Sequence, residues 1–215
     1  MKPKTVAVLS AWLLALAFLL PSPSLAGGAG FYLTVGGGNA ETESDTFGGT
    51  IREDEESSHR GFGFTFDTNL NQPGKLFNYR MNAGYERLQF KVDDGTSPNN
   101  GLKTRTNGFV LEQDFGFGGQ VAPNVRLWGG PCLRLSFHRG DDDFDNDYKF
   151  AGIGVGPVAG VNFGTGGAVT LSLRGGYLLN GYGGRWSSPG GARRDYSAEE
   201  DYFFLTLGTY FGSGG

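Results

Sequence analysis

The feature that most constrains this chain is an alternation of apolar and polar residues with a period of two, which recurs in eight segments between residues 31 and 211. Phe62, Phe64 and Phe66, for example, alternate with small or polar residues. Such alternation is typical of β-strands with one apolar face. Beyond residue 26, no stretch approaches the roughly 18 apolar residues that indicate a membrane-spanning helix. The chain therefore predicts an all-β fold of eight antiparallel strands.

The connections between the eight segments alternate between short and long. The short ones contain residues that favour tight turns and lie at residues 69–74, 122–124 and 164–167. The long ones are polar and run through residues 37–57, 93–104, 139–147 and 181–200. Short turns at one end and long loops at the other are typical of an up-and-down transmembrane barrel. With an even number of strands, both ends of the barrel domain lie on the short-turn side.

The first 26 residues differ from the rest and predict a cleaved secretory signal peptide. A basic start, Lys2 and Lys4, precedes an apolar run at residues 6–20 that is shorter than the about 20 residues of a spanning helix. Pro-Ser-Pro-Ser and the small residues of Ser24-Leu25-Ala26 follow, which favours cleavage over a membrane anchor. The predicted organisation is a signal peptide at residues 1–26 and one barrel domain at residues 27–215.

Composition narrows the possible functions. The chain has 18 basic and 22 acidic residues, a net charge of −4, which argues against nucleic acid as a partner. Cys132 is the single cysteine, so neither an internal disulfide nor a cysteine-based metal site is expected. We read Cys132 as a small filler on the polar face. No cofactor is predicted.

The charged residues within the segments lie on the polar face, with both signs equally represented. The four carboxylates are Asp67, Glu86, Glu112 and Asp114, and the four arginines are Arg80, Arg126, Arg134 and Arg174. Unpaired buried charges are costly, and pairing offsets much of the cost. The balance therefore predicts one inward network in a narrow lumen. Glycines at positions 152, 154, 156 and 160 on the same face leave room for Trp128 and Arg134 of the preceding segment.

Aromatic residues on the apolar face gather at the short-turn ends of the segments. They are Phe31, Phe66, Phe77, Tyr79, Phe115, Phe117, Phe163 and Phe211. A ring of aromatic side chains at one end is typical of a girdle at a membrane interface. It favours a membrane barrel, with the apolar face outward, over a soluble barrel with an apolar core.

One segment breaks the alternation. Near Glu86 the parity changes, and Leu88, Phe90 and Val92 continue the apolar pattern one position out of phase. An extra residue in one strand would produce this change, so the pattern predicts a β-bulge.

With these features, residues 30 to 211 resemble the small eight-stranded outer-membrane proteins of Gram-negative bacteria, broadly the OmpA-type and OmpX-type barrels. The resemblance implies insertion by the outer-membrane assembly machinery, which recognises a last strand that ends in aromatic residues. Thr206-Leu207-Gly208-Thr209-Tyr210-Phe211 supplies the polar residue, glycine and aromatic of that pattern, but Gly212 to Gly215 follow where a second terminal aromatic is expected. Outer-membrane lipid and lipopolysaccharide are further implied partners.

Several short motifs resemble binding or catalytic sites. Gly154-Val155-Gly156-Pro157-Val158-Ala159 has the spacing of a dinucleotide fingerprint, but that motif must open a helix, and a strand pattern surrounds it. The acidic run at residues 141–147 lacks the Gly and Glu of an EF-hand loop, so solvated acid is favoured over divalent-ion binding. Ser136 and His138 share a face, and His59 follows two serines, yet neither stretch supplies a complete catalytic set.

The sequence thus predicts a non-enzymatic outer-membrane surface protein with a charge-paired, largely closed lumen and acidic extracellular loops whose partner is left open. Three alternatives remain: a narrow channel for small solutes, a lipid A-modifying enzyme, and a soluble periplasmic barrel.

Overall fold

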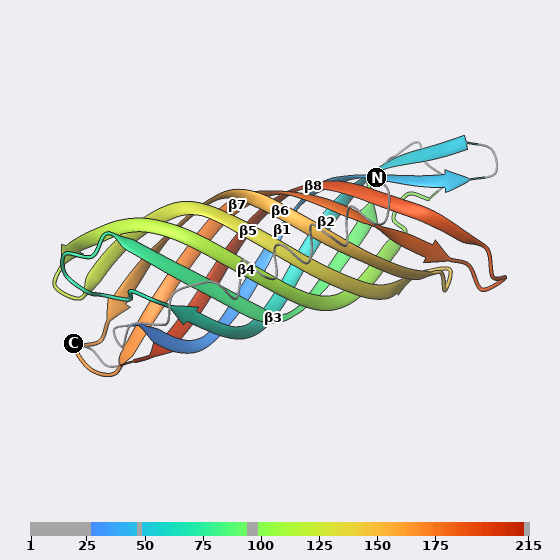
Figure 1. The fold of residues 1–215 in the computed structure, drawn as a ribbon. Helices are drawn as coiled ribbons and strands as arrows, with labels where there is room; N and C mark the ends of the chain where they lie inside the picture. The colour runs from blue at the N-terminus through green and yellow to red at the C-terminus, as the bar shows by residue number, and fades with distance from the viewer. Residues whose placement is uncertain (1–26, 47–48, 94–98, 213–215) are drawn as a thin grey trace, which may run out of the picture.

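The computed structural model of the chain describes residues 27–46, 49–93 and 99–212. The predicted signal peptide therefore lies outside the described residues. The strands are β1 (Gly28–Thr46), β2 (Gly49–Asp67), β3 (Phe77–Val92), β4 (Lys103–Ala122), β5 (Val125–Asp142), β6 (Asp147–Gly164), β7 (Val169–Ser187) and β8 (Arg193–Phe211). Each strand pairs antiparallel with its neighbour in sequence, and β8 pairs with β1 to close the barrel (Figure 1). The predicted fold class is confirmed.

The predicted long loops continue as paired strands over much of their length. β1 and β2 stay in register up to the pair Thr46 and Gly49, and β7 and β8 up to Ser187 and Arg193. The connection between β5 and β6 spans only residues 143–146. Figure 1 shows these extensions projecting at the end opposite the short turns. Where both faces of a strand meet water or polar neighbours, the period-two signal weakens while backbone pairing continues, so sequence reasoning placed the strand ends too early.

The predicted β-bulge in β3 is wrong. The pairing of β3 with β2 runs without a shift from Arg80 opposite Asp67 to Val92 opposite Glu55. Leu88, Phe90 and Val92 therefore share the inward face with Glu86, and each is at most 2% exposed. The chemistry of the inward face changes along β3, whereas the parity does not.

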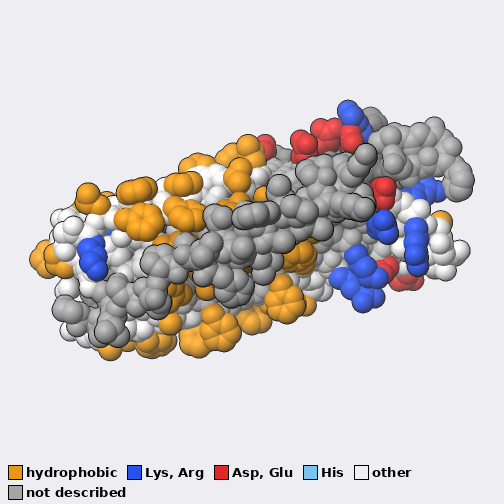
Figure 2. All heavy atoms as spheres, in the orientation of Figure 1, with side chains coloured by type: hydrophobic (Ala, Val, Ile, Leu, Met, Phe, Trp, Pro, Cys, Tyr) orange, Lys and Arg blue, Asp and Glu red, His pale blue; other side chains and the backbone are white. Residues whose placement is uncertain are grey.

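The outward face carries a wide apolar band. Its exposed members include Leu33, Phe64, Phe109, Phe137 and Leu205, which expose between 48% and 71% of their surface. Figure 2 shows this band in orange over the part of the barrel nearer the short turns, while most of the visible charged side chains lie at the other end. We call this surface the apolar band, and the strands beyond it the upper extension.

Glycines on the inward face make room for large side chains from neighbouring strands. A Cβ at Gly160 would overlap the Trp128 ring, and one at Gly152 would overlap the Tyr182 ring. The structure thus places the predicted glycine column on β6 opposite bulky residues, which is how an eight-stranded barrel fills its interior.

The described residues contain no helix long and apolar enough to cross a membrane.

Candidate functional site

The structure places all eight predicted lumen charges on the inward face, each at most 3% exposed. Five of them, Asp114, Arg174, Glu112, Arg134 and Glu86, form one continuous chain of ion pairs. The remaining three, Asp67, Arg80 and Arg126, lie nearer the short turns, and among the described residues none of them forms an ion pair with this chain. The predicted single network of eight is therefore divided into the chain of five, the pair of Asp67 and Arg80, and Arg126.

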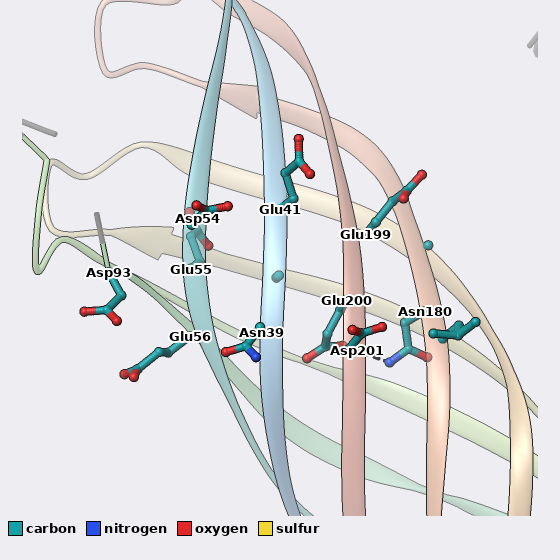
Figure 3. A pocket seen from close by; sticks show the side chains of 13 residues that line it. Asn39, Glu41, Asp54, Glu55, Glu56, Asp93, Asn180, Glu199, Glu200 and Asp201 are labelled. Carbon is teal, nitrogen blue, oxygen red and sulfur yellow. Dashed lines mark hydrogen bonds between the residues drawn. The ribbon is translucent and has the colours of Figure 1, made fainter. Parts of the chain in front are cut away.

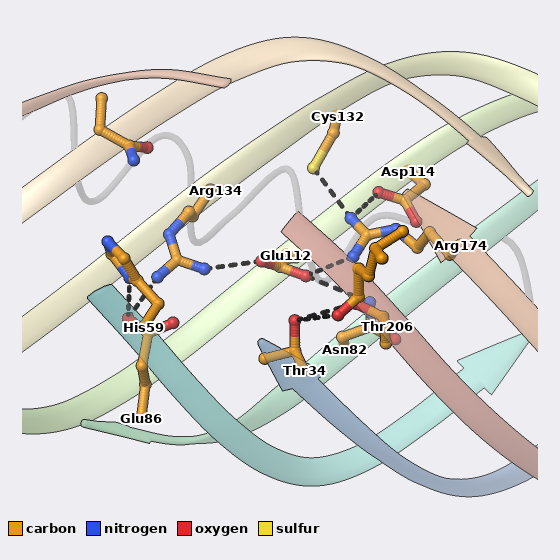
Figure 4. A network of polar contacts seen from close by, with 12 residues as sticks. Thr34, His59, Asn82, Glu86, Glu112, Asp114, Cys132, Arg134, Arg174 and Thr206 are labelled. Carbon is orange, nitrogen blue, oxygen red and sulfur yellow. Dashed lines mark hydrogen bonds and ion pairs between the residues drawn. The ribbon is translucent and has the colours of Figure 1, made fainter. Parts of the chain in front are cut away.

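Glu112 of β4 is the centre of the chain (Figure 4). One carboxylate oxygen accepts from Arg134 of β5 at 2.6 Å, and the other accepts from Arg174 of β7 at 2.8 Å. Arg174 also donates to Asp114 at 2.7 Å and to the sulfur of Cys132 at 3.3 Å. Because these side chains come from strands on different sides of the barrel, their pairing bridges the lumen.

The chain continues upward through residues that the sequence prediction did not include. Arg134 donates to Glu86 of β3, whose carboxylate lies 3.1 Å from His59 Nδ1. His59 Nε2 then lies 2.7 Å from Glu200 of β8. We call the seven residues the charge ladder: Asp114, Arg174, Glu112, Arg134, Glu86, His59 and Glu200. The polar stretch at residues 181–200 predicts a loop at Glu200, although the alternation of Glu200 with Tyr202 and Phe204 indicates an inward position.

Aromatic rings pack against the ladder cations. Arg134 lies 5.1 Å from the centre of the Tyr202 ring, and Arg174 lies 4.5 Å from that of Phe204. Buried Trp128, Leu178 and these two rings form an apolar cluster inside the lumen. Contacts of this kind contribute about 0.5–2 kcal/mol each, so they offset part of the desolvation of the arginines.

The short-turn end is closed by a separate polar group. Arg80 donates to Asp67 at 2.9 Å and lies 4.4 Å from the centre of the Trp128 ring. Arg126 has no carboxylate partner among the described residues. Its guanidinium instead donates to the backbone carbonyls of Lys75 and Leu76, at 2.6 and 2.9 Å. Arg126 therefore fastens the β2–β3 connection to the barrel.

That connection folds over the mouth of the lumen. Leu70 is buried, and its carbonyl accepts from Asn162 of β6 at 2.9 Å. A Cβ on Gly28 of β1 would meet the Leu70 side chain, so the leucine also contacts the first strand. Contacts with β1 and β6 show that the segment crosses the opening.

The upper end is closed by apolar side chains. Leu88 and Phe90 of β3 pack with Phe150 of β6, Tyr182 of β7 and Tyr196 of β8. We call these five residues the aromatic plug. The rings of Phe150 and Tyr182 lie 5.5 Å apart in an edge-to-face contact, the arrangement that aromatic pairs prefer. The lumen is thus occupied by charge in the middle and by a conventional apolar core above.

The histidines are not arranged for nucleophilic catalysis. Both ring nitrogens of His59 face carboxylates, Glu86 and Glu200, so neither is available as a base for a serine. His138 stacks on Phe150, and within the described residues no hydrogen bond joins it to Ser136.

The acidic run at residues 141–147 is held together by its own contacts. Asp142 accepts from the backbone N–H groups of Phe144 and Asn146. Asp143 pairs with Arg105 at 2.7 Å, and this hydrogen bond lowers the pKa of the carboxyl. No group of three or more His, Cys, Asp or Glu side chains among the described residues is arranged to hold a metal ion.

The eight residues of the predicted aromatic girdle all belong to the outward face of their strands. Phe31, Phe77, Phe117, Phe163 and Phe211 expose between 44% and 62% of their surface. Tyr79 differs, with 7% exposure: its ring lies against Phe115, and its hydroxyl donates to Gln113 at 3.2 Å. Phe66 and Phe115 are half-buried.

Acidic residues line a hollow of about 710 Å³ on the upper extension, formed by β1, β2, β7 and β8 (Figure 3). Its carboxylates are Glu41, Asp54, Glu55, Glu56, Asp93, Glu199, Glu200 and Asp201. Glu55 is buried and accepts from Thr42, and burial raises its pKa to about 7.

No protein-family model matches the chain, and no curated protein matches it in sequence. Among solved structures, it is similar to the outer membrane protein OprG from Pseudomonas aeruginosa, with a TM-score of 0.61, 14% identity and coverage of 88% of this chain and 100% of OprG. Neisserial surface protein A also matches (TM-score 0.33, 13% identity, 84% and 98% covered), as does outer membrane protein AlkL (0.39, 13%, 91% and 97%). The likeness to OprG supports the barrel fold.

Proposed function

We propose that this protein is a non-enzymatic barrel of the Gram-negative outer membrane, closed to solutes, that carries a strand-built projection on the cell surface. The apolar band supports the membrane location. A soluble protein rarely exposes contiguous apolar patches larger than a few hundred Å², and here exposed Phe and Leu side chains surround the barrel. By the rule for such barrels, the short turns face the periplasm and the upper extension faces outward.

The observation that carries the closed lumen is the charge ladder. Its members come from strands on several sides of the barrel, so a solute on the barrel axis would have to separate Glu112 from Arg134 or Arg174. Breaking a buried ion pair by removing one partner costs about 3–5 kcal/mol. The aromatic plug above and the Leu70 segment below add two further barriers.

Three partners follow from this proposal. The outer-membrane assembly machinery would act on β8, which ends with Phe211 outward and with Tyr210 inward, its ring centre 5.0 Å from Arg80. Lipopolysaccharide would surround the upper edge of the apolar band. A loop-binding partner would meet the hairpin tips of the upper extension, which replace the long loops expected from the sequence.

Conductance across a planar bilayer tests the proposal. The native barrel should show heat-modifiable migration, fractionate with the outer membrane and give no discrete conductance steps. A triple variant, Glu112→Ala, Arg134→Ala and Arg174→Ala, removes the centre of the ladder and serves as the control for an opened lumen.

Discrete steps from the native protein would establish the channel alternative. Recovery in the soluble periplasmic fraction would instead overturn the membrane location. A change in lipid A mass that depends on the protein would establish the enzyme alternative.

A further inference from the structure

A row of cations borders the apolar band on one side of the barrel. Going around the wall from β2 to β6, Arg60, Arg87, Asn107, Arg139 and Lys149 are direct neighbours in strand register. All five are exposed. The row begins directly above the outermost apolar residue on three of these strands, because Phe62, Tyr85 and Phe137 lie two positions nearer the short turns than Arg60, Arg87 and Arg139.

The opposite side of the barrel has the reverse charge. On β8, β1 and β2, Glu199, Glu41 and Asp54 are direct neighbours in register, and all three are exposed (Figure 3). Asp201 of β8 lies two positions above Phe203, which faces outward. The exposed charges beyond the apolar band thus differ around the wall, with cations on β2–β6 and carboxylates on β8, β1 and the tip of β2. Arg52 at the tip of β2 is an exception, and it pairs with Glu41 and Glu43.

Two cations of the row lie where the protein gives them no anion. Arg60 and Arg87 are directly opposite one another, and neither has an ion-pair partner among the described residues. Like charges at directly opposed positions destabilise a sheet. An external anion between or above the two guanidinium groups would offset this repulsion.

A hollow of about 500 Å³ lies beside the other two cations. Arg139 and Lys149 form its polar edge, and Tyr85, Phe109, Phe137 and Ala151 line its apolar part. Phe109 and Phe137 are 71% and 61% exposed. Asp147 lies 2.8 Å from Lys149 and 3.4 Å from Arg139, which holds the two cations together while leaving most of Arg139 in solvent.

We propose that this face of β2–β6 binds the phosphate-bearing headgroup of an outer-leaflet lipid. The phosphate would lie against the cation row, and the acyl chains would cover Phe109 and Phe137. The vertical order of charge above apolar surface matches the order of phosphate above acyl chain in a phosphorylated lipid. This proposal rests on the proposed membrane location. It adds that the barrel selects lipids with a phosphate-bearing headgroup.

Arginine suits this position because its planar guanidinium recognises phosphate with two hydrogen bonds and is weakly hydrated. At the edge of the hydrocarbon, each cation contributes roughly a fivefold gain in affinity for an anionic surface. The acidic face would repel the same headgroup, so lipid would bind one side of the barrel.

Native mass spectrometry of the detergent-solubilised barrel tests the site, with lipid A and dephosphorylated lipid A as probes. The double variant Arg139→Gln, Lys149→Gln should bind lipid A about thirtyfold more weakly, as two cations are removed. The matched control is Glu199→Gln, Asp201→Asn, which changes two charges on the opposite face and should not weaken lipid A binding. Dephosphorylated lipid A should bind the native barrel as weakly as lipid A binds the double variant.

Equal binding of both lipids by the native barrel, or an equal effect of both double variants, would overturn the site. Binding of inorganic phosphate as tightly as lipid A would also overturn it, since the acyl chains would then contribute nothing. Heat-modifiable folding in vesicles is measured beforehand for each variant. A native barrel that fails to insert contradicts the proposed function itself, whereas an inserted barrel without lipid preference contradicts only this site.

Discussion

The barrel is built differently in its two halves, although the same strands run through both. Beside the apolar band, the interior holds the charge ladder and the exterior holds exposed Phe and Leu. In the upper extension, the interior holds the aromatic plug and the exterior holds cations and carboxylates. Beside the apolar band, the barrel has a polar interior and an apolar exterior, the reverse of a soluble protein. The upper extension has the apolar interior and polar exterior of a soluble protein.

β3 shows where the change occurs. Arg80 and Glu86 face inward within the band, and Leu88 and Phe90 face inward directly above it. On the outward face, exposed Tyr85 is followed by exposed Arg87. The odd or even position of a residue along the strand determines which face it lies on. Whether that face is polar or apolar depends on what surrounds it at that height of the barrel. If each face of β3 is assumed to be either polar or apolar along its whole length, only a bulge explains the sequence pattern. The strand contains no such bulge.

The largest effect is expected from the ladder. Glu112→Gln leaves Arg134 and Arg174 without their shared carboxylate in the lumen, and breaking a buried pair in this way costs about 3–5 kcal/mol. Urea unfolding in lipid vesicles measures it. The control is Asp143→Asn, which removes an exposed partner of Arg105 and should barely move the midpoint. Equal shifts for the two variants would contradict the closed lumen.

The second prediction separates the two exteriors. Leu133 faces outward in the middle of β5, and Leu133→Arg should cost about 2–4 kcal/mol because arginine is expensive at the bilayer midplane. Ser197 faces outward on the upper extension of β8, where Ser197→Arg should be tolerated. Folding yield into vesicles compares the two. If Ser197→Arg were the more harmful, the assignment of the membrane to the apolar band would be wrong.

The third prediction separates the two interiors. Leu88→Ala removes a fully buried side chain from the aromatic plug and should lower local stability by about 2 kcal/mol, the low end for such truncations. Local opening need not involve the whole barrel, so hydrogen exchange should rise in the upper parts of β3 and β6 first.

Leu133→Ala is the matched truncation on the lipid side, where acyl chains can fill the space, and its exchange pattern should stay native. Uniform loss of protection along β3 in Leu88→Ala would mean that the two halves unfold as one unit.

The sequence predicted the number of strands, the closure of the barrel and the inward position of all eight charges, because period-two alternation determines which face each residue lies on. The sequence did not predict that these charges are divided into separate groups. Arg126 has backbone carbonyls as partners, and no pattern in the sequence marks a turn that folds back over the mouth. Glu200 falls in a predicted polar connection, because a charged stretch beyond the apolar band has the composition of a loop, and only strand pairing shows otherwise. The sequence places His59 near the loop-side end of its segment but does not predict its contact with Glu200.

The smallest predicted effect concerns Glu55, an inward carboxylate of the upper extension. One of its oxygens accepts from Thr42 at 3.2 Å, and the other has no partner among the described residues. Burial raises the pKa of Glu55 to about 7 from its ordinary value of 4.5. A raised folded-state pKa means that the folded protein favours the protonated form. The associated stability is therefore complete below about pH 4.5 and is lost as the pH rises through 7.

Glu55→Gln keeps the neutral form at every pH, so its advantage over the native protein should be near zero at pH 4.5 and should grow as the pH rises through 7. Hydrogen exchange in the upper parts of β1 and β2 measures this difference without requiring the whole barrel to unfold. Glu56→Gln is the control, because Glu56 is the exposed neighbour that faces Lys91 on the outer surface. A pH-independent difference for Glu55→Gln would show that water reaches this carboxylate, and the upper interior would then be wetter than the aromatic plug implies.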